Sequence, residues 1–309
     1  MSLKSYEEYS KKYDIIEGLV DLGSKFEGGL GRRNERAKHV LIFHLDSIDI
    51  RDEWHQVLAF FFTGNGASAI ELKHIVFALL DKLKEIGVDV KLLVCDQGSN
   101  NRKLYNSLKV THSRPYFIYK GKKYFAIFDW PHLIKRLWYQ IRKHKYIYTR
   151  SKISNNYVPI VSFQDMVATW RIDQSKNSNL LNLKYEHFFP NNFQAMNVKR
   201  TFQVFGKRMA SAVATAGNCK NLRSLTWRKT SQFIRMMDNV IDACNSSSIK
   251  SLNNYLLTLS AQNSTVINCL QNFKSYCSDW KVKRIDKKKL QFPSKYLLLQ
   301  NLRVLLAYN

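Results

Sequence analysis

Short apolar runs alternate with charged or glycine-containing stretches over the first part of the chain. Four of these runs have strand length and are rich in aliphatic and aromatic residues, which predicts β-strands. Between residues 70 and 86 the apolar residues instead recur every three or four positions, and Gly87 follows. This spacing predicts an amphipathic helix that ends at that glycine. The predicted strands are 18–23, 39–45, 55–64 and 89–95.

The remaining elements of this first part are a loop, two helices and a hairpin. The segment 26–37 is rich in glycine and charge and is predicted to be a loop. A second helix is expected to begin near Asn100, and residues 114–129 predict a hairpin with Gly121 in its turn. Pro131 is a suitable first residue for a further helix. The order indicates an α/β fold with a mixed sheet, not a doubly wound parallel one.

Strand signals fade after residue 150, and helical periodicity takes over. Helices are predicted within 191–216, 230–246 and 251–280, so residues 151–290 are expected to form a separate, mostly α domain. On the second of these helices one apolar stripe is accompanied by a polar face with residues at i, i+4 and i+7. The residues on that polar face are Asp238, Asp242 and Asn245.

Positive charge is concentrated in the second part of the chain. The net charge is +25; residues 1–130 hold 20 Lys or Arg and 17 Asp or Glu, whereas residues 131–309 hold 29 and 7. The segment 131–164 has seven basic residues and no acidic one. Nucleic acid is the first candidate partner for such a region, against the alternative of a soluble lysine-rich surface. Membrane binding is a minor alternative, because segment 132–144 could form an amphipathic basic helix.

Several other classes of protein are disfavoured. The sequence has no uncharged apolar stretch of 18 residues and no signal-peptide core. Its five cysteines are odd in number and lack CxxC spacing, which argues against a disulfide scaffold or a zinc finger and favours the cytosol or nucleus. The glycine-rich segment 28–31 matches neither of the common phosphate-binding glycine patterns.

The segment VCDQGSNN places a carboxylate, Asp96, directly after the predicted strand 89–95. Ligands and metals collect at the carboxyl ends of strands in open sheets. A carboxylate there can hold Mg²⁺, and two such ions about 3.5–4 Å apart would clamp the oxygens of a phosphoryl transfer. The alternative, equally supported by spacing, is that Asp96 caps the helix after Gly98.

The segment FDWPHLIK places Asp129 and His132 three residues apart across a predicted helix start, so both could face one site. On spacing alone, the better-supported interpretation is an N-cap aspartate with a satisfied histidine beside it.

Four separate blocks of the chain resemble one family. The segments YDIIEGLVDLGS and VCDQGSNN, the hairpin and FDWPHLIK match, in order and spacing, the P-element-like transposases that carry a THAP domain. The segments NNFQAMNVKRTFQVFGKRMASAVA and FIRMMDNVIDACNS resemble the GTP-binding insertion domain of the same family. The resemblance covers nearly the whole chain and is weakest over 150–185 and 250–309.

This resemblance implies a ribonuclease-H-like catalytic domain of α/β class with a mixed sheet, interrupted by an all-α GTP-binding insertion domain. The corresponding ranges are 1–150 for the catalytic core, 151–290 for the insertion domain and 291–309 for the return to the core. Members of the family cleave and transfer DNA strands with Mg²⁺ held by two aspartates and a glutamate. In the family GTP assists assembly on DNA and does not drive the reaction.

The resemblance also assigns the catalytic residues. It places the second metal-binding aspartate at Asp96, as both catalytic residue and metal ligand. Asp129 and His132 match the Asp-x-x-His block of the family, which supports the active site.

Five residues are assigned to the nucleotide. Asp242 and Asn245 match the Asp-x-x-Asn nucleotide contacts, and a carboxylate suits the N1–H and 2-amino group of guanine. Lys184, Asn197 and Val198 fall near family positions that touch the nucleotide.

The chain departs from the family pattern at several points. Asn197 stands where the family has a lysine and Gly206 where it has a serine, and both changes bear on nucleotide affinity. The first catalytic aspartate of the family lies before the block that begins here at Met1, and the final glutamate lies beyond Asn309. The expected sheet therefore lacks its first strand, and the THAP zinc finger is missing.

Two hypotheses follow. The first is a transposase-derived internal fragment that is catalytically incomplete and, by itself, inactive in strand transfer. The alternative is a non-catalytic module, from a domesticated or decayed transposon, that binds guanine nucleotide and DNA. Both predict a protein that binds GTP and DNA, and the catalytic hypothesis adds Mg²⁺. The expected location is the nucleus, the expected DNA partners are transposon ends and target, no membrane association is expected, and the resemblance allows a homo-oligomer.

Overall fold

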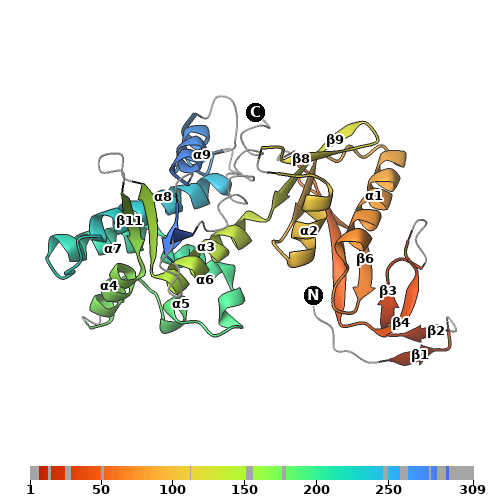
Figure 1. Ribbon diagram of the computed structural model, residues 1–309, viewed down its shortest axis with the longest axis horizontal. Helices are drawn as coiled ribbons and strands as arrows, with labels where there is room; N and C mark the ends of the chain where they lie inside the picture. The colour runs from red at the N-terminus through yellow and green to blue at the C-terminus, as the bar shows by residue number, and fades with distance from the viewer. Residues whose placement is uncertain are drawn as a thin grey trace. The chain divides into compact units, whose positions relative to one another are not determined.

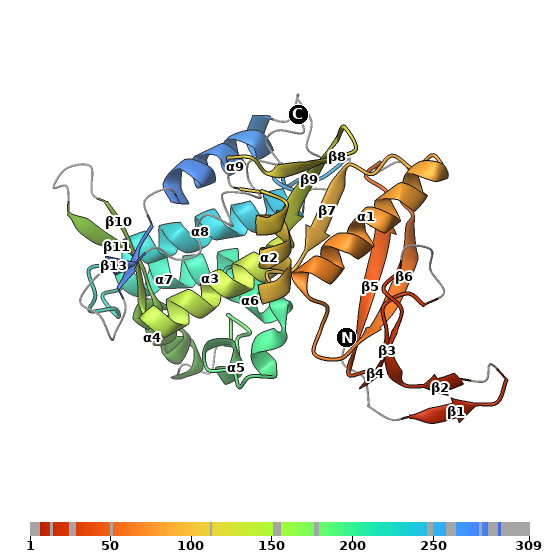
Figure 2. The same cartoon turned by 45° about the vertical axis from the view of Figure 1, so that its right-hand side comes forward.

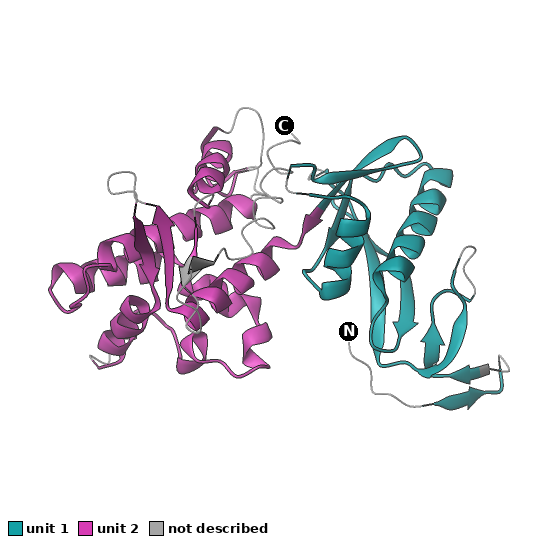
Figure 3. Cartoon of the chain, viewed as in Figure 1, with its two compact units in different colours: residues 1–126 teal, residues 127–309 magenta. Residues whose placement is uncertain are grey.

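The computed structural model describes residues 7–12, 15–24, 29–49, 52–111, 113–150, 156–175, 179–245, 250–257, 264–277, 280–283 and 290–291. The chain divides into two compact units, residues 1–126 and 127–309 (Figure 3). Within the described ranges, no helix combines the length and apolarity needed to cross a membrane.

A four-stranded antiparallel sheet forms the centre of the first unit (Figures 1 and 2). The strand order is β4-β3-β6-β5, and β5 and β6 pair along their whole lengths. A separate hairpin joins the short strands β1 and β2. The predicted strands at 18–23, 39–45 and 55–64 are confirmed. The strands are β1 (Glu8–Ser10), β2 (Ile15–Glu17), β3 (Leu19–Asp21), β4 (Arg32–Arg36), β5 (His39–Asp46) and β6 (His55–Thr63).

Strand β4 corrects the predicted loop at 26–37. All five of its residues are exposed, and three of them are arginines, so the segment has none of the apolar alternation that marks a strand. β4 pairs with β3 at the edge of the sheet. Charged side chains suit an edge strand, because they oppose pairing with further chains. The sequence pattern missed this strand because edge pairing does not require burial.

Helix α1 (Ala69–Glu85) covers one face of this sheet (Figure 2). Its N-terminus is closed by a capping box, in which Ser68 and Glu71 each accept a hydrogen bond from the backbone N–H of the other. The chain leaves the helix through Gly87 at φ +80°, as predicted. The buried cluster between helix and sheet consists of Val20, Leu22, Phe61, Ile75 and Leu79.

A second, three-stranded sheet in the order β7-β9-β8 completes the first unit. Its strands are β7 (Leu92–Cys95), β8 (Tyr116–Tyr119) and β9 (Lys122–Phe128), and α2 (Ser99–Ser107) follows β7. The hairpin prediction is confirmed: Lys120 and Gly121 form the turn with φ values of 46° and 76°, which is typical of type I′. The prediction of a buried strand at 89–95 was wrong in part, because β7 is an edge strand and Val94 is 49% exposed.

The second unit is built mainly of helices (Figure 1). Helix α8 packs against α7, α9 and β11. The helix predicted to follow Asp129 is confirmed as α3. The elements are α3 (Trp130–His144), β10 (Tyr146–Arg150), β11 (Tyr157–Ser162), α4 (Phe163–Ser175), α5 (Tyr185–Phe188), the 3₁₀ helix η1 (Gln194–Met196), α6 (Val198–Val204), α7 (Lys207–Asn218), α8 (Trp227–Cys244), α9 (Ser264–Cys277), β12 (Val282–Lys283) and β13 (Leu290–Gln291).

The helices predicted within 191–216, 230–246 and 251–280 correspond to α6 and α7, α8, and α9. Residues 251–257 are not helical, and 258–263 and 278–279 lie outside the described residues.

The prediction of a mostly α domain missed strand β11. This strand pairs with β10 in a two-stranded antiparallel sheet. It contains Pro159, which disfavours a strand in sequence patterns but is tolerated where one side of the strand is unpaired. The boundary between the two compact units, at residues 126 and 127, lies before the boundary at 150 expected from the family resemblance. The assignment of family domains to 1–150, 151–290 and 291–309 stays a prediction.

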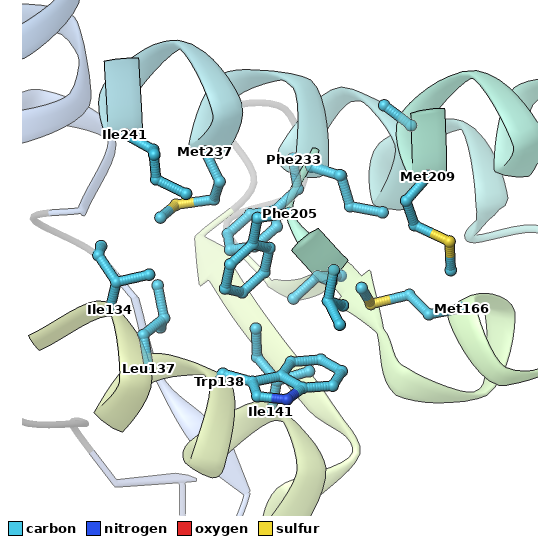
Figure 4. Close-up of a cluster of buried hydrophobic side chains, with 14 of the residues drawn as sticks. Ile134, Leu137, Trp138, Ile141, Met166, Phe205, Met209, Phe233, Met237 and Ile241 are labelled. Carbon is cyan, nitrogen blue, oxygen red and sulfur yellow. The ribbon is translucent and has the colours of Figure 1, made fainter. Parts of the chain in front are cut away.

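One apolar core holds the second unit together (Figure 4). The predicted stripe of α8 faces it, with Phe233, Met237 and Ile241 buried against residues of α3 and α7. Trp138 of α3 and Phe205 lie in the middle of this cluster, their ring centroids 5.7 Å apart. The core therefore brings α3 together with α6, α7 and α8, far from it in sequence.

Candidate functional site

Asp96 lies directly after β7, in the turn that leads into α2. Its Oδ1 atom accepts hydrogen bonds from the backbone N–H of Gly98 at 2.7 Å and from Asn101 Nδ2 at 2.8 Å. The N-cap of α2 is Gly98, so the Asp96 side chain does not occupy the cap position that the alternative interpretation predicted. The carboxylate is exposed and forms no ion pair with another described residue.

The local structure fixes the orientation of this carboxylate. A β-carbon at Gly98 would lie 2.9 Å from Asp96 Oδ1, so the glycine leaves room for the side chain to fold onto the turn. Because Oδ1 is engaged in the turn, Oδ2 is the oxygen without a hydrogen bond to the described residues. Mg²⁺ is often bound through one or two carboxylates with waters and substrate phosphates as the other ligands. Asp96 therefore fits the role of a single oxygen ligand.

Asp129 and His132 form a pair at the start of α3. Asp129 occupies the N-cap position but makes no cap hydrogen bond; its Oδ2 instead contacts His132 Nδ1. Both side chains remain partly exposed, at 35% and 42%. These residues belong to the second unit and Asp96 to the first, so their action in one active site stays a prediction. No cluster of three or more His, Cys, Asp or Glu side chains suited to a metal occurs in the described ranges.

A cavity of about 280 Å³ lies between α7, α8 and the segment before α5. It is lined by Asp242, one of the residues assigned to the nucleotide, and by Gly206. The side chain of Asp242 is anchored by Asn253, whose Nδ2 donates to Oδ2 at 2.7 Å. The lining residues are Leu181, Asn182, Gln203, Gly206, Lys207, Arg208, Asp238 and Asp242.

Two carboxylates face this cavity from adjacent turns of α8. Burial raises the pKa of Asp238, and the neighbouring charge of Asp242 adds to the effect. Asp238 Oδ2 is buried without a described hydrogen-bond partner, and Lys207 Nζ lies 3.8 Å from it. A buried acceptor of this kind is costly to leave unpaired. A ligand that brings N–H donors into the cavity would satisfy it.

Positively charged residues lie at the N-terminus of α7. Gly206 is the N-cap and offers no side-chain cap; the backbone N–H of Lys207 instead hydrogen-bonds to Asp238, and that of Met209 to Gly206 O at 3.0 Å. Lys207 and Arg208 follow at once and line the same cavity. The cavity is thus lined both by carboxylates, which accept hydrogen bonds, and by cationic side chains, which bind anions. This combination suits a guanine base with its phosphates.

The other residues assigned to the nucleotide do not line this cavity. Asn197 is the N-cap of α6 and accepts from Arg200 N at 3.4 Å, and Val198 is the first residue of that helix. Lys184 is exposed before α5, and Asn245 follows α8 with its N–H bonded to Asp242 O at 3.0 Å. The roles of these four residues stay predictions.

Asp238, Lys207 and Arg208 were missed as candidate ligands. The sequence pattern placed Asp238 on the same helix face as Asp242, four residues before it, but did not assign it to the ligand. Lys207 and Arg208 gave no such signal, since basic residues are common throughout this half of the chain.

Comparison with known families identifies both units. Residues 1–109 match the family described as TNP-like, RNase H N-terminal domain, and residues 140–255 match the TNP-like, GTP-binding insertion domain. A stretch of 172 residues, 54% of the chain, is 26% identical to the transposable element P transposase of Drosophila melanogaster. The chain belongs to the P-element-like transposases. Its match spans 22% of that relative, so the whole relative is much longer than the shared part.

The fold of a P-element-like transposase is also found by structural comparison. The chain is similar to a chain of the Drosophila P element transposase strand transfer complex, with a TM-score of 0.73 and 20% identity. The likeness covers 100% of this chain and 63% of the other. The predicted fold class, a ribonuclease-H-like α/β domain followed by a helical GTP-binding insertion domain, is confirmed.

Proposed function

We propose that this chain carries part of the catalytic core and the nucleotide-binding domain of a P-element-like transposase, whose activity is metal-dependent cleavage and transfer of DNA strands with GTP as assembly cofactor. The observation that supports this most directly is the coexistence of two features in one chain. A strand-end carboxylate with one oxygen left for a ligand lies in the region that matches the RNase H domain. A cavity of mixed polarity lies in the region that matches the GTP-binding domain.

Asp96 is the proposed metal ligand of the catalytic core. Its Oδ2 would bind a divalent ion while Gly98 and Asn101 hold Oδ1 and keep the side chain in one orientation. When bound, such an ion neutralises phosphate charge and activates an oxygen nucleophile. Asp129 and His132 are proposed to support the same chemistry. One carboxylate cannot place two divalent ions for in-line transfer, so we propose that this polypeptide alone is inactive.

The 309-residue polypeptide is expected to give no strand-transfer product with Mg²⁺ or Mn²⁺ and DNA that carries transposon ends. The check is an excision or strand-transfer assay with labelled DNA, run beside the Asp96→Ala variant. Product that forms with the wild-type chain and disappears with Asp96→Ala would contradict the proposed inactivity. Equal absence of product in both supports it.

GTP is the proposed ligand of the cavity between α7 and α8. Asp242 and Asp238 would accept the N1–H and 2-amino hydrogens of guanine, and the cationic side chains of Lys207 and Arg208 would bind phosphate. Placing guanine donors next to Asp238 Oδ2 would satisfy its buried, unpaired oxygen. Lys184, Asn197, Val198 and Asn245 are proposed as further nucleotide contacts.

Replacing Asp242 by alanine is expected to weaken GTP binding about 10- to 100-fold, since hydrogen bonds to a charged group contribute about 1.5–3 kcal/mol. Titration calorimetry with GTP, inosine triphosphate and ATP checks this, because inosine lacks the 2-amino group and adenine lacks both donors. Asn253→Ala is the matched control: it removes the internal hydrogen bond of Asp242 but keeps the carboxylate. If Asp242→Ala binds GTP as tightly as the wild type, this nucleotide site is wrong.

DNA is the proposed macromolecular partner, both transposon ends and target, and the nucleus is the proposed location. The support is the basic second part of the chain, with 29 Lys or Arg against 7 Asp or Glu over 131–309. Affinity that rests on phosphate contacts falls steeply with salt. Self-association into a homo-oligomer is part of the same proposal.

The alternative function is a non-catalytic module that binds guanine nucleotide and DNA. It is favoured by the contrast between a cavity lined by both carboxylates and basic side chains in the second unit and a single carboxylate at the end of β7. The coding sequence around the chain separates the two. An in-frame strand ending in aspartate before Met1, with a glutamate-bearing helix after Asn309, supports the enzyme; in-frame stop codons support the module.

A further inference from the structure

A second cavity of about 180 Å³ lies between α3 and the segment from α5 to α6. Of the residues that line it, Asn197 is the one proposed above as a ligand contact. Three helical segments and the 3₁₀ helix contribute to its walls. The lining residues are Lys135, Arg136, Trp138, Tyr139, Arg142, Glu186, His187, Pro190, Gln194, Ala195, Asn197, Arg200 and Thr201.

Positive charge dominates this cavity. Lys135 and Arg142 lie seven residues apart on α3, a spacing that puts them on one face, and Arg200 reaches the cavity from α6. No carboxylate in the described part of the chain forms an ion pair with any of these three side chains. Glu186 is the one acidic residue among the lining residues, against four basic ones. The side chains of Lys135, Arg142 and Arg200 therefore have no ion-pair partner among the described residues.

Hydrogen bonds fix Arg200 and the wall of the cavity. Arg200 Nη1 donates to Gln194 O at 3.1 Å, which fixes one arginine against the wall. Trp138 is buried and donates from Nε1 to His187 O at 3.1 Å, which ties α3 to α5 behind the cavity. Arg142 is half-buried, and burial lowers the pKa of its guanidinium. A desolvated cation of this kind gains strongly from an incoming anion, because little water competes for it.

The volume indicates what kind of anion fits. Pockets that enclose a drug-sized ligand have about 300–1,000 Å³. At about 180 Å³ this cavity is smaller, so it suits a single anionic group that belongs to a larger molecule lying across the surface. Guanidinium groups prefer phosphate and carboxylate, and Arg–phosphate contacts are among the strongest hydrogen bonds in proteins.

We propose that the cavity formed by Lys135, Arg142 and Arg200 binds a backbone phosphate of a DNA strand. The inference rests on the proposed DNA-handling function and adds the residues that perform it. The same chemistry would also accept a phosphate of GTP, since the two cavities adjoin: His187 lines this one, Gln203 lines the other, and their side chains are hydrogen-bonded at 2.8 Å. The experiment must therefore measure both ligands.

The test measures binding of a fluorescent oligonucleotide by anisotropy at several salt concentrations, and GTP binding by calorimetry, on the same full-length variants. Lys135→Gln and Arg142→Gln are each expected to weaken DNA binding about tenfold. Each should lower the slope of log affinity against log salt by about 1. Glu186→Gln is expected to tighten DNA binding, because it removes the one negative charge of the cavity. The matched control is Lys199→Gln, which removes the same charge from an exposed neighbour of Arg200 outside the cavity.

Unchanged GTP affinity, with weaker DNA binding by Lys135→Gln and Arg142→Gln, tighter binding by Glu186→Gln and an unaffected control, supports the proposal. It is overturned if Lys199→Gln weakens DNA binding as much as Arg142→Gln does, or if Arg142→Gln weakens GTP binding and leaves DNA binding intact. Thermal melting of each variant shows whether it is folded. Lys135 and Glu186 are both half-exposed, and their replacement by glutamine is expected to change DNA affinity in opposite directions. Failure of the wild type to bind GTP would reject the nucleotide proposal alone, since the DNA measurements do not depend on it.

Discussion

Asp165→Ala is expected to lower the free energy of unfolding of the second unit by about 3–5 kcal/mol, because it breaks a buried hydrogen-bond network. Asp165 is 2% exposed and lies in the first turn of α4. Its two carboxylate oxygens accept hydrogen bonds from the hydroxyls of Ser224, Thr226 and Thr230. The Asp165 side chain thus links α4 by hydrogen bonds to residues 224–230, at the start of α8.

The cost is large because the partners stay behind. Thr230 is fully buried, and its Oγ1 also accepts from the backbone N–H of Ser162 at 3.0 Å, so the network reaches β11 as well. Without Asp165 the hydroxyl of Thr230 has lost its acceptor in a place that water does not reach. An unsatisfied buried donor costs about 1–3 kcal/mol, and the half-buried hydroxyls of Ser224 and Thr226 lose their acceptor as well.

Urea unfolding followed by tryptophan fluorescence measures the effect, since five of the six tryptophans lie in residues 127–309. Thr230→Val should reproduce part of the loss, because it removes one donor and one acceptor. Glu186→Gln changes a half-exposed acidic residue in the same unit and should stay within about 0.5 kcal/mol of the wild type. A loss below about 1 kcal/mol for Asp165→Ala would show that the network contributes little.

Trp138→Ala is expected to destabilise the second unit by about 3–5 kcal/mol, the usual range for removing a buried tryptophan or phenylalanine side chain. Trp138 is 4% exposed, and its ring centroid lies 5.8 Å from that of Phe163 and 6.1 Å from that of Phe188. Together with the contact to Phe205 (Figure 4), this ring joins α3 to three other segments. The same unfolding experiment measures the loss.

Two conservative variants separate packing from hydrogen bonding. Trp138→Phe keeps an aromatic ring but leaves the carbonyl of His187 without its donor, which adds about 1–3 kcal/mol. Trp280→Phe removes an Nε1–H that is buried without a hydrogen-bond partner among the described residues, so it carries no such penalty. Trp138→Phe should therefore be the more destabilising of the two. Equal losses would mean that the Trp138 hydrogen bond does not contribute.

The candidate sites show where sequence patterns reach their limit. Asp96 was found because an apolar run ends there, and the structure adds that Gly98 and Asn101 engage one of its oxygens. Asp242 was found by family resemblance, but its partners in the cavity were not. Lys207 lies 35 positions before it, and only the packing of α7 against α8 brings them together.

Local patterns determined the elements whose burial is regular. The period of the apolar residues predicted α1 and α8, the alternation of short runs predicted β5 and β6, and Gly87 and Gly121 marked the turns where positive φ is needed. The family and its fold class also followed from the sequence, because four blocks keep their order and spacing.

Only the tertiary structure determined which segments form the edge strands β4 and β11 and which residues line the cavities. β4 is charged throughout and β11 contains a proline, so each is a strand because a partner supplies its hydrogen bonds. The cavity lined by Lys135 and Arg200 joins residues that are far apart in the chain. The physical reason is the same in both cases: side-chain periodicity reports burial within one element, whereas pairing between elements depends on long-range packing that no local window contains.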